Sequence, residues 1–335
     1  MGSARGNLLD VSGLKVDFYT YRGVIKALNG VELWIDEGEK ISVVGETGCG
    51  KSVTALSIMQ LIDDPGRIVN GKILFKGKDL NTLKEPALNK IRGKDISMIF
   101  QEPISALNPT LRIGYQVAEN LLRNHKWIKV KKVRGDLEKI LRVVELDWER
   151  VTSLYPHELS GGMAQRAMIA IALSSNPQLL IADEPTSALD VTIQIQILDL
   201  LNDLVEKFDT AVLLITHDMG VAAFFSDKIA VMYAGNTIEF AKTSDIFKNP
   251  IHPYTQGLLK SVPKIGMSTE LESIRGSVPD LVNPPPGCRF HPRCRYAMPV
   301  CKESLPILTP AGVEHYVACL LYDKERVDDA TTSEQ

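Results

Sequence analysis

A short apolar strand and the glycine-rich loop after it decide the fold: ISVV (41–44) is followed by GETGCGKS (45–52) and then by a helical pattern. The loop matches G-x4-G-K-[ST] in the strand–loop–helix context that a phosphate-binding loop requires. Glycines let such a loop wrap closely, so that successive backbone N–H groups point at phosphate oxygens beside a helix N-terminus. The sequence therefore predicts a P-loop nucleotide site.

The side chains of this loop have separate expected roles. Lys51 would reach the β- and γ-phosphates of ATP, and the Ser52 hydroxyl would ligate Mg²⁺. Cys49 needs no redox role, because the variable loop positions contribute mainly backbone. The predicted nucleotide contacts are Gly45, Glu46, Thr47, Gly48, Cys49, Gly50, Lys51, Ser52 and Val53.

A second apolar strand, LLIADE (179–184), ends in two carboxylates. Asp183 would lie next to Ser52 and hold Mg²⁺, usually through water. Glu184 would polarise the attacking water as a general base. One carboxylate for the metal and the next for water is the division of labour that ATP hydrolysis needs.

Length and composition limit the class of protein. At 335 residues the chain has room for one large or two modest domains. Its formal net charge of −3 gives no global field for nucleic acid, so no nucleic-acid partner is expected. No apolar run approaches a membrane span, and the N-terminus lacks a signal core. We therefore expect a cytoplasmic protein unless another protein holds it at a membrane.

Apolar runs that alternate with helical patterns predict an α/β fold with a largely parallel sheet. Residues 8–34 alternate like antiparallel strands with a turn near Arg22, and a helix is expected after Asp190. Residues 102–165 read as an α-helical insertion, and a Pro-rich tail begins near 250. We predict a nucleotide domain over 1–250 and a small irregular Cys-rich domain over 251–335. The expected core strands are 41–44, 96–100, 179–182, 212–216 and 229–233.

The segment LSGGMAQR (159–166) resembles the LSGGQ element of ABC-transporter ATPases, with Met163 in place of the usual Gln. Ser160 is a good helix N-cap, and Gly161 and Gly162 allow close backbone approach. The resemblance implies that this helix end faces the γ-phosphate of ATP bound to a second ATPase subunit. One nucleotide site would then draw on two chains.

Other elements resemble this family in the expected order. Gln101 matches the Q-loop glutamine, which ligates Mg²⁺ and senses the membrane subunits. His217 matches the switch histidine, which contacts the γ-phosphate. Tyr19 is our choice for the aromatic that stacks on adenine, with Phe18 and Tyr21 as alternatives. Val53 replaces a Thr often found there, so one hydroxyl contact to phosphate is lost.

The segments FQEPISALNPTLRIGYQ (100–116) and NPIHPYTQGLLKSVP (249–263) resemble the ATPase subunits of bacterial dipeptide, oligopeptide and nickel importers. The resemblance implies a peripheral protein on the cytoplasmic face of the membrane. Its partners would be a second ATPase subunit, identical or paralogous, two transmembrane permeases and, indirectly, an extracytoplasmic binding protein. A dipeptide importer is our preferred assignment, and nickel or another small solute is the alternative.

Two other classes fit the sequence less well. A soluble ABC ATPase of translation or DNA repair usually has two nucleotide domains or a long insertion before the LSGG element, and this chain has neither. A non-catalytic scaffold would have a degenerate site, whereas Lys51, Asp183, Glu184 and His217 are all intact.

Four of the five cysteines fall in the last 50 residues, which suggests a metal centre because structural disulfides are rare in the cytoplasm. Four thiolates suit either Zn²⁺ or a [4Fe–4S] cluster. The tail resembles that of peptide-importer ATPases in which such cysteines hold a cluster. We therefore predict a [4Fe–4S] cluster, with Zn²⁺ as the alternative. The expected ligands are Cys288, Cys294, Cys301 and Cys319.

Overall fold

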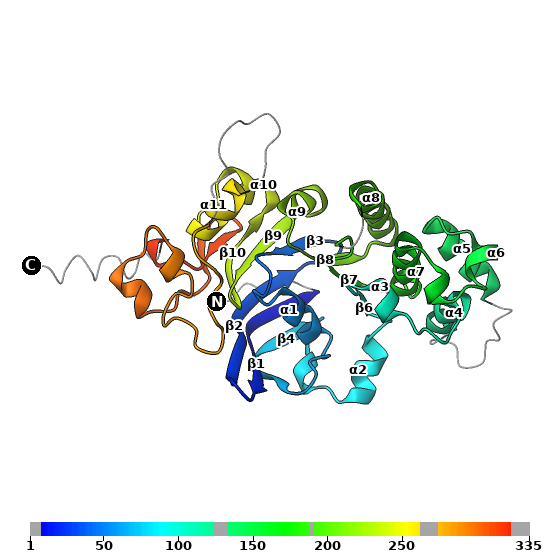
Figure 1. Cartoon of the computed structure of the whole chain (residues 1–335), viewed down its shortest axis with the longest axis horizontal. Helices are drawn as coiled ribbons and strands as arrows, with labels where there is room; N and C mark the ends of the chain where they lie inside the picture. Colours follow the sequence, from blue (N-terminus) through cyan, green and yellow to red (C-terminus); the bar gives the residue numbers. More distant parts are fainter. Residues whose placement is uncertain (1–7, 123–132, 188–189, 262–273, 323–335) are drawn as a thin grey trace, which may run out of the picture. The chain divides into compact units, whose positions relative to one another are not determined.

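The computed structural model describes residues 8–122, 133–187, 190–261 and 274–322 (Figure 1). The chain forms two compact units. Unit 1 takes in residues 1–35, 40–82 and 215–335, and unit 2 takes in 36–39 and 83–214. The phosphate loop and the C-terminal tail therefore belong to the same unit, although more than 200 residues separate them.

Unit 1 contains a four-stranded antiparallel sheet in the order β2-β1-β4-β5. Its strands are β1 (Leu9–Thr20), β2 (Gly23–Ile35), β4 (Gly66–Phe75) and β5 (Lys78–Asp79). The hairpin of β1 and β2 confirms the antiparallel opening and the turn expected at Arg22. β4 and β5 were not predicted.

A second group of strands in unit 1 runs in the order β11-β12-β10-β9-β3. β3 and β9 are parallel, whereas β10 pairs with its two neighbours in the antiparallel sense. The tail strand β12 thus extends the sheet that carries β3. The bounds are β3 (Lys40–Val44), β9 (Lys228–Tyr233), β10 (Asn236–Lys242), β11 (Thr309–Gly312) and β12 (His315–Val317).

Buried side chains of β3, β9 and β10 form the core of this part of unit 1. Tyr233, Tyr254 and Phe290 belong to it, and Cys288 and Cys294 pack against it. The tail is therefore built onto this core through its aromatic and thiol side chains. The surrounding helices are α1 (Lys51–Ile58), α9 (Met219–Phe225), α10 (Thr243–Lys248) and α11 (Pro253–Lys260).

Unit 2 holds β6 (Ile96–Ile99), β7 (Leu179–Asp183) and most of β8 (Ala211–Thr216), in the order β8-β7-β6. The long helix α8 (Val191–Phe208) begins after its N-cap Asp190, as predicted. Between β6 and β7 the described residues form helices and no strand, which confirms the helical insertion. Its helices are α3 (Pro103–Ala106), α4 (Ile113–Leu122), α5 (Arg134–Val143), α6 (Trp148–Val151) and α7 (Gly161–Leu173).

The predicted core strands are all present, and the α/β character of the fold is confirmed. A separate Cys-rich domain is not confirmed, because β12 of the tail pairs with β10 through Glu239 and Phe240. In residues 274–322, the described part of the tail beyond α11, the regular structure consists of short 3-10 turns and the β11–β12 hairpin. The domain boundary at residue 250 stays a prediction.

Candidate functional site

The loop 45–52 connects β3 to α1 and encloses the ammonium group of Lys51. Lys51 Nζ donates to the carbonyl oxygen of Gly45 at 2.8 Å and to that of Glu46 at 3.2 Å. The Lys51 side chain is buried, and α1 begins at this residue. The loop therefore combines a buried cation with a helix N-terminus, which is the electrostatic requirement for holding phosphate.

Close packing requires glycine at two positions of this loop. A Cβ at Gly45 would lie 2.3 Å from the carbonyl oxygen of Met232. A Cβ at Gly50 would lie 3.1 Å from the carbonyl oxygen of Ala27, and the φ of +104° at this residue is itself unfavourable for any other residue. Cys49 is fully buried, and burial raises the pKa of its thiol, which favours the protonated form.

The parallel register of β6 and β7 brings two predicted site residues of unit 2 together. Ile99 pairs with Ala182, and Gln101 and Glu184 each follow two residues later. Because parallel strands end at the same edge of a sheet, both side chains reach the same place. Gln101 Nε2 donates to Glu184 Oε2 at 3.3 Å. Asp183, the last residue of β7, immediately precedes Glu184 and is buried.

Glu184 has an unusual backbone conformation, with φ at +45°. This left-handed region is costly for a residue other than glycine and occurs preferentially at functional sites. The turn is fixed by Ser187, whose N–H and hydroxyl both donate to the Glu184 carbonyl oxygen at 3.2 Å.

The LSGG segment lies at the start of α7 in unit 2. Ser160 is its N-cap, and the Ser160 hydroxyl accepts from the Met163 N–H at 3.3 Å. Ser160 and Gly161 are exposed, so the helix N-terminus faces outward. A Cβ at Gly162 would make only an ordinary contact, 3.5 Å from Ile193 Cγ2. The fold of this chain thus does not itself demand glycine at that position.

Two further predicted residues lie at strand ends of unit 1. His217 is exposed and follows β8, directly before Asp218, which caps α9. Tyr19 lies near the end of β1, 48% exposed, with the Arg67 guanidinium 5.9 Å from its ring centroid. Adenine stacking on Tyr19 stays a prediction.

One contact of the phosphate loop was missed by the sequence analysis. Arg293 of the tail forms an ion pair with Glu46, 3.0 Å between Nη1 and Oε1. Tyr254 of α11 accepts the Glu46 N–H at 3.0 Å through its hydroxyl. The only signal in the sequence was the segment around residue 250, which was noted for its family likeness and not for any contact.

The four tail cysteines do not form a ready metal site. Among the described residues, which include all four, no three His, Cys, Asp or Glu side chains gather tightly enough to hold a metal ion. The predicted [4Fe–4S] cluster or zinc site is therefore not supported. Two of these cysteines are nevertheless joined through their backbones, because the Cys288 N–H donates to the Cys301 carbonyl oxygen at 2.8 Å. The Cys301 Sγ is contacted by the Met298 N–H at 3.5 Å.

Burial favours the protonated form of three of these thiols, those of Cys288, Cys294 and Cys319. It raises the pKa of Cys288 to about 11 and that of Cys319 to about 12, and the negative charges of neighbouring thiolates add to both shifts. The pKa of Cys294 is raised for the same two reasons. A bound cation would reverse this preference, because metal ligation requires the thiolate.

Comparison with known proteins extends these observations to the whole chain. Residues 28–187 match the model of the ABC transporter family, and residues 238–301 match that of the oligopeptide/dipeptide transporter C-terminal region. The oligopeptide transport ATP-binding protein AppD of Bacillus subtilis is 49% identical over 96% of this chain and 99% of its own length. This chain belongs to the ABC transporter family. It is an ATPase of that family.

Other similar proteins are also ATP-binding proteins of transporters or ATP-binding cassettes. The dipeptide transport ATP-binding protein DppD of Lactococcus lactis is 45% identical to this ABC protein over 96% of the chain and 92% of its own length. The solved structure of the ATP-binding cassette MJ0796, a dimer in a post-hydrolysis state with ADP and Pi, is 31% identical with a TM-score of 0.64. It covers 70% of this chain and 99% of its own. Helices long and apolar enough to cross a bilayer are absent from the described part of this chain.

Proposed function

We propose that this chain is the ATP-hydrolysing subunit of an importer for di- or oligopeptides, bound to the inner face of the membrane through separate permease subunits. The observation that carries the proposal is the phosphate loop: Lys51 is buried inside it, and α1 begins at its end. The names of the relatives support the peptide cargo.

Within this function, the residues of the phosphate loop would hold ATP, with Lys51 on the β- and γ-phosphates. The Ser52 hydroxyl, Gln101 and Asp183 would hold Mg²⁺, which neutralises charge on the transferred phosphoryl group when bound. Oxygen donors of this kind suit that ion.

Glu184 is proposed as the general base. Its strained backbone and its hydrogen bond to Gln101 fix the carboxylate at the strand end, where it would accept a proton from the attacking water. His217 would contact the γ-phosphate from its position after β8.

The LSGG segment is proposed to act on nucleotide held by a second ATPase subunit. The exposed N-terminus of α7 supports this role, and so does a glycine at 162 that the chain's own packing does not require. A helix N-terminus presents N–H groups and positive partial charge to an anion. The partner subunit would be a second copy or a paralogue.

The function is tested by purifying the chain from native membranes and identifying the proteins that come with it. We expect two permeases and an ATPase subunit. In proteoliposomes, the purified complex should hydrolyse ATP faster when a binding protein loaded with dipeptide is supplied. Stimulation by a nickel-loaded binding protein, and none by peptide, would favour the metal cargo instead.

We also propose that the four tail cysteines bind an inorganic centre, with [4Fe–4S] preferred to Zn²⁺. The support is that the cysteines lie in one part of the tail: the Cys288 N–H donates to the Cys301 carbonyl oxygen at 2.8 Å, and Cys288 and Cys294 pack against the same core. The four cysteine side chains would have to move closer together to bind the group, because in this structure no three of them are placed to hold a single metal ion. Iron, sulfide and zinc analysis of anaerobically purified protein distinguishes the two.

A further inference from the structure

Arg293 uses its whole guanidinium group to join three segments of unit 1. Nη1 donates to both carboxylate oxygens of Glu46, at 3.0 and 3.1 Å, and contacts the Tyr233 hydroxyl at 3.4 Å. Nε and Nη2 donate to three successive backbone carbonyls, those of Arg275 (2.9 Å), Ile274 (3.4 Å) and Gly276 (3.3 Å). Only 7% of this side chain is exposed.

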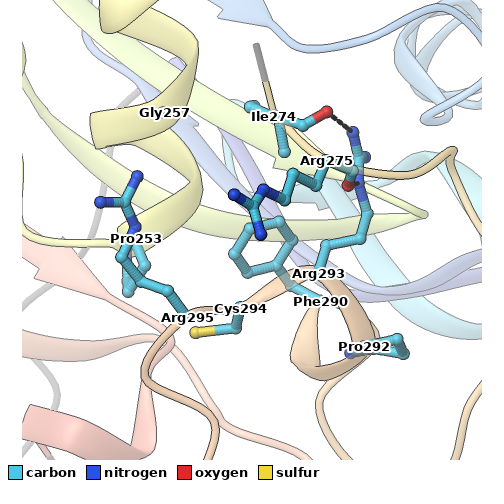
Figure 2. A pocket seen from close by; sticks show the side chains of 9 residues that line it. All are labelled: Pro253, Gly257, Ile274, Arg275, Phe290, Pro292, Arg293, Cys294 and Arg295. Carbon is cyan, nitrogen blue, oxygen red and sulfur yellow. Dashed lines mark hydrogen bonds between the residues drawn. The ribbon is translucent and has the colours of Figure 1, made fainter. Parts of the chain in front are cut away.

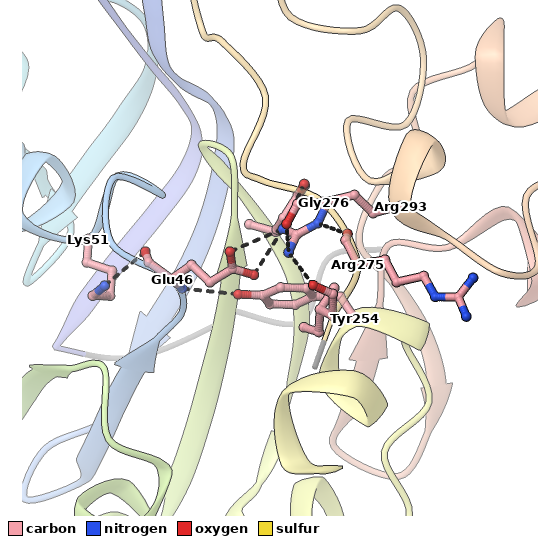
Figure 3. A network of polar contacts seen from close by, with 8 residues as sticks. Glu46, Lys51, Tyr254, Arg275, Gly276 and Arg293 are labelled. Carbon is pink, nitrogen blue, oxygen red and sulfur yellow. Dashed lines mark hydrogen bonds and ion pairs between the residues drawn. The ribbon is translucent and has the colours of Figure 1, made fainter. Parts of the chain in front are cut away.

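Glu46, in turn, is held from two sides (Figure 3). Its carboxylate meets Arg293, while its backbone N–H donates to the Tyr254 hydroxyl at 3.0 Å. Its carbonyl oxygen accepts from Lys51 Nζ, the proposed phosphate ligand. A single loop residue therefore connects the tail and α11 to the lysine of the phosphate loop.

This connection is strong enough to affect the loop. The ion pair is charge-assisted, and the Arg293 side chain is 7% exposed against 28% for Glu46, so removing Glu46 would leave a largely buried guanidinium charge without its carboxylate. The Arg293 guanidinium cannot turn to another acceptor without giving up backbone carbonyls that it already binds. It acts as a fixed point to which the loop is attached.

We propose that Arg293 is a positioning residue of the nucleotide site. Through Glu46 it holds the phosphate loop in the conformation in which its N–H groups and Lys51 can meet the phosphates, and it thereby sets the affinity for ATP. In this proposal Arg293 acts through Glu46 and not by contact with the nucleotide. The inference rests on the proposed role of loop 45–52 in binding ATP.

A neighbouring arginine provides a matched control. Arg293 lines a cavity of about 670 Å³ together with Arg275 and Arg295 (Figure 2). Arg275 contributes its carbonyl to the Arg293 network, and its side chain is exposed. Arg275→Gln therefore removes a positive charge from the same surroundings and keeps the carbonyl that Arg293 binds.

The first test measures the Kd of Mg-ATP for the full-length chain by fluorescence of a labelled analogue. Arg293→Gln should raise the Kd roughly tenfold, within the range typical of coupling between two sites. Arg275→Gln should leave it within about twofold of the wild type, because a lone exposed charge contributes little. Equal Kd values for wild type and a folded Arg293→Gln variant would overturn the proposal.

The second test uses the sign of an effect at Glu46. A carboxylate beside a phosphate site repels the phosphates of ATP. If this repulsion were the only effect of Glu46, removing its carboxylate should tighten ATP binding. If Glu46 instead transmits the position of Arg293, Glu46→Ala should weaken binding. The double variant should be no weaker than the poorer single variant, because residues in one network are not additive. If Glu46→Ala binds ATP more tightly than the wild type, the positioning role of Arg293 is contradicted, even if Arg293→Gln does not fold.

A third readout separates a local effect from general destabilisation. Amide hydrogen exchange of residues 45–50 should quicken in both variants, while β1 and β2 keep their protection. If amide protection is instead lost uniformly throughout unit 1, Arg293 and Glu46 stabilise the whole unit and do not specifically position the phosphate loop. Lys51→Ala distinguishes the two levels of inference: if it binds ATP normally, the role of the loop itself is wrong. If it fails to bind while Arg293→Gln binds normally, only the positioning role is wrong.

Discussion

Gln101 and Glu184, which are 83 residues apart, meet at 3.3 Å because β6 and β7 run parallel and each side chain follows a paired strand end by two residues. The amide donates, so the carboxylate is an acceptor on that side. The Glu184 oxygens are thus oriented by the fold before any substrate arrives.

Glu184→Gln should bind Mg-ATP about as tightly as the wild type and hydrolyse it at least about 10²-fold more slowly, because the general base is gone while the phosphate loop is unchanged. Steady-state phosphate release and nucleotide binding measure the two properties. Gln101→Ala is the companion variant, since it leaves the base but removes the amide that donates to its carboxylate. Near-normal turnover by Glu184→Gln would remove this residue from the proposed role.

Lys51→Ala should weaken nucleotide binding itself. A hydrogen bond from a charged donor contributes about 1.5–3 kcal/mol, so the Kd for ATP should rise roughly 10- to 150-fold. Thermal unfolding must be followed as a control, because Lys51 is buried against the carbonyls of Gly45 and Glu46. Unchanged affinity in a folded variant would contradict the assignment of the loop.

Mixing experiments test the site shared between subunits. In a homodimer, a Ser160→Arg chain combined with a Lys51→Ala chain can form at most one intact composite site of the two. Activity should therefore appear on mixing two preparations that are each inactive alone. Turnover per chain that stays constant on dilution to nanomolar protein would argue against the dimer mechanism.

His252 should make the protein acid-sensitive. Its ring is fully buried, which lowers its pKa to about 4 despite the opposing charge of Glu239, and its Nδ1 accepts the Tyr254 N–H at the start of α11. Between pH 6.5 and 4 the unfolded chain binds a proton that the folded chain does not. The free energy of unfolding should therefore fall by about 3 kcal/mol as the pH drops through this window.

A variant isolates that contribution. His252→Asn keeps an oxygen that can cap α11 but does not titrate. Urea unfolding at several pH values should show a shallower dependence between pH 6.5 and 4 than in the wild type. The same slope in both proteins would mean that other groups control the acid response.

The tail cysteines make the remaining prediction. Cys→Ser at any of the four should lose the bound iron, or zinc, and leave ATP binding intact. Protein that contains neither metal after anaerobic purification, and whose thiols all react with a thiol reagent on unfolding, would show that these cysteines are simply buried reduced thiols.

Local sequence patterns were sufficient for the strand, loop and helix around Lys51 and for the N-cap at Ser160, because backbone geometry there depends on neighbouring residues. The contact between Gln101 and Glu184 needed the strand register, which no local pattern gives. Arg293 lay among tail cysteines, and nothing in the sequence connects it to Glu46. The pairing of β12 with β10 was also missed, because a strand of three residues is too short to show an alternation of apolar and polar side chains.

The Arg293–Glu46 ion pair also has a consequence for biosynthesis. Glu46 is made 247 residues before its partner. At about 5–20 residues per second, translation needs roughly 12 to 50 seconds to cover that interval. During this time the phosphate loop of the nascent chain has no guanidinium to hold it. A ribosome that stops before residue 293 should therefore leave a chain whose early strands can pair but whose nucleotide loop is not yet fastened, so that full ATP affinity is among the last properties the protein acquires.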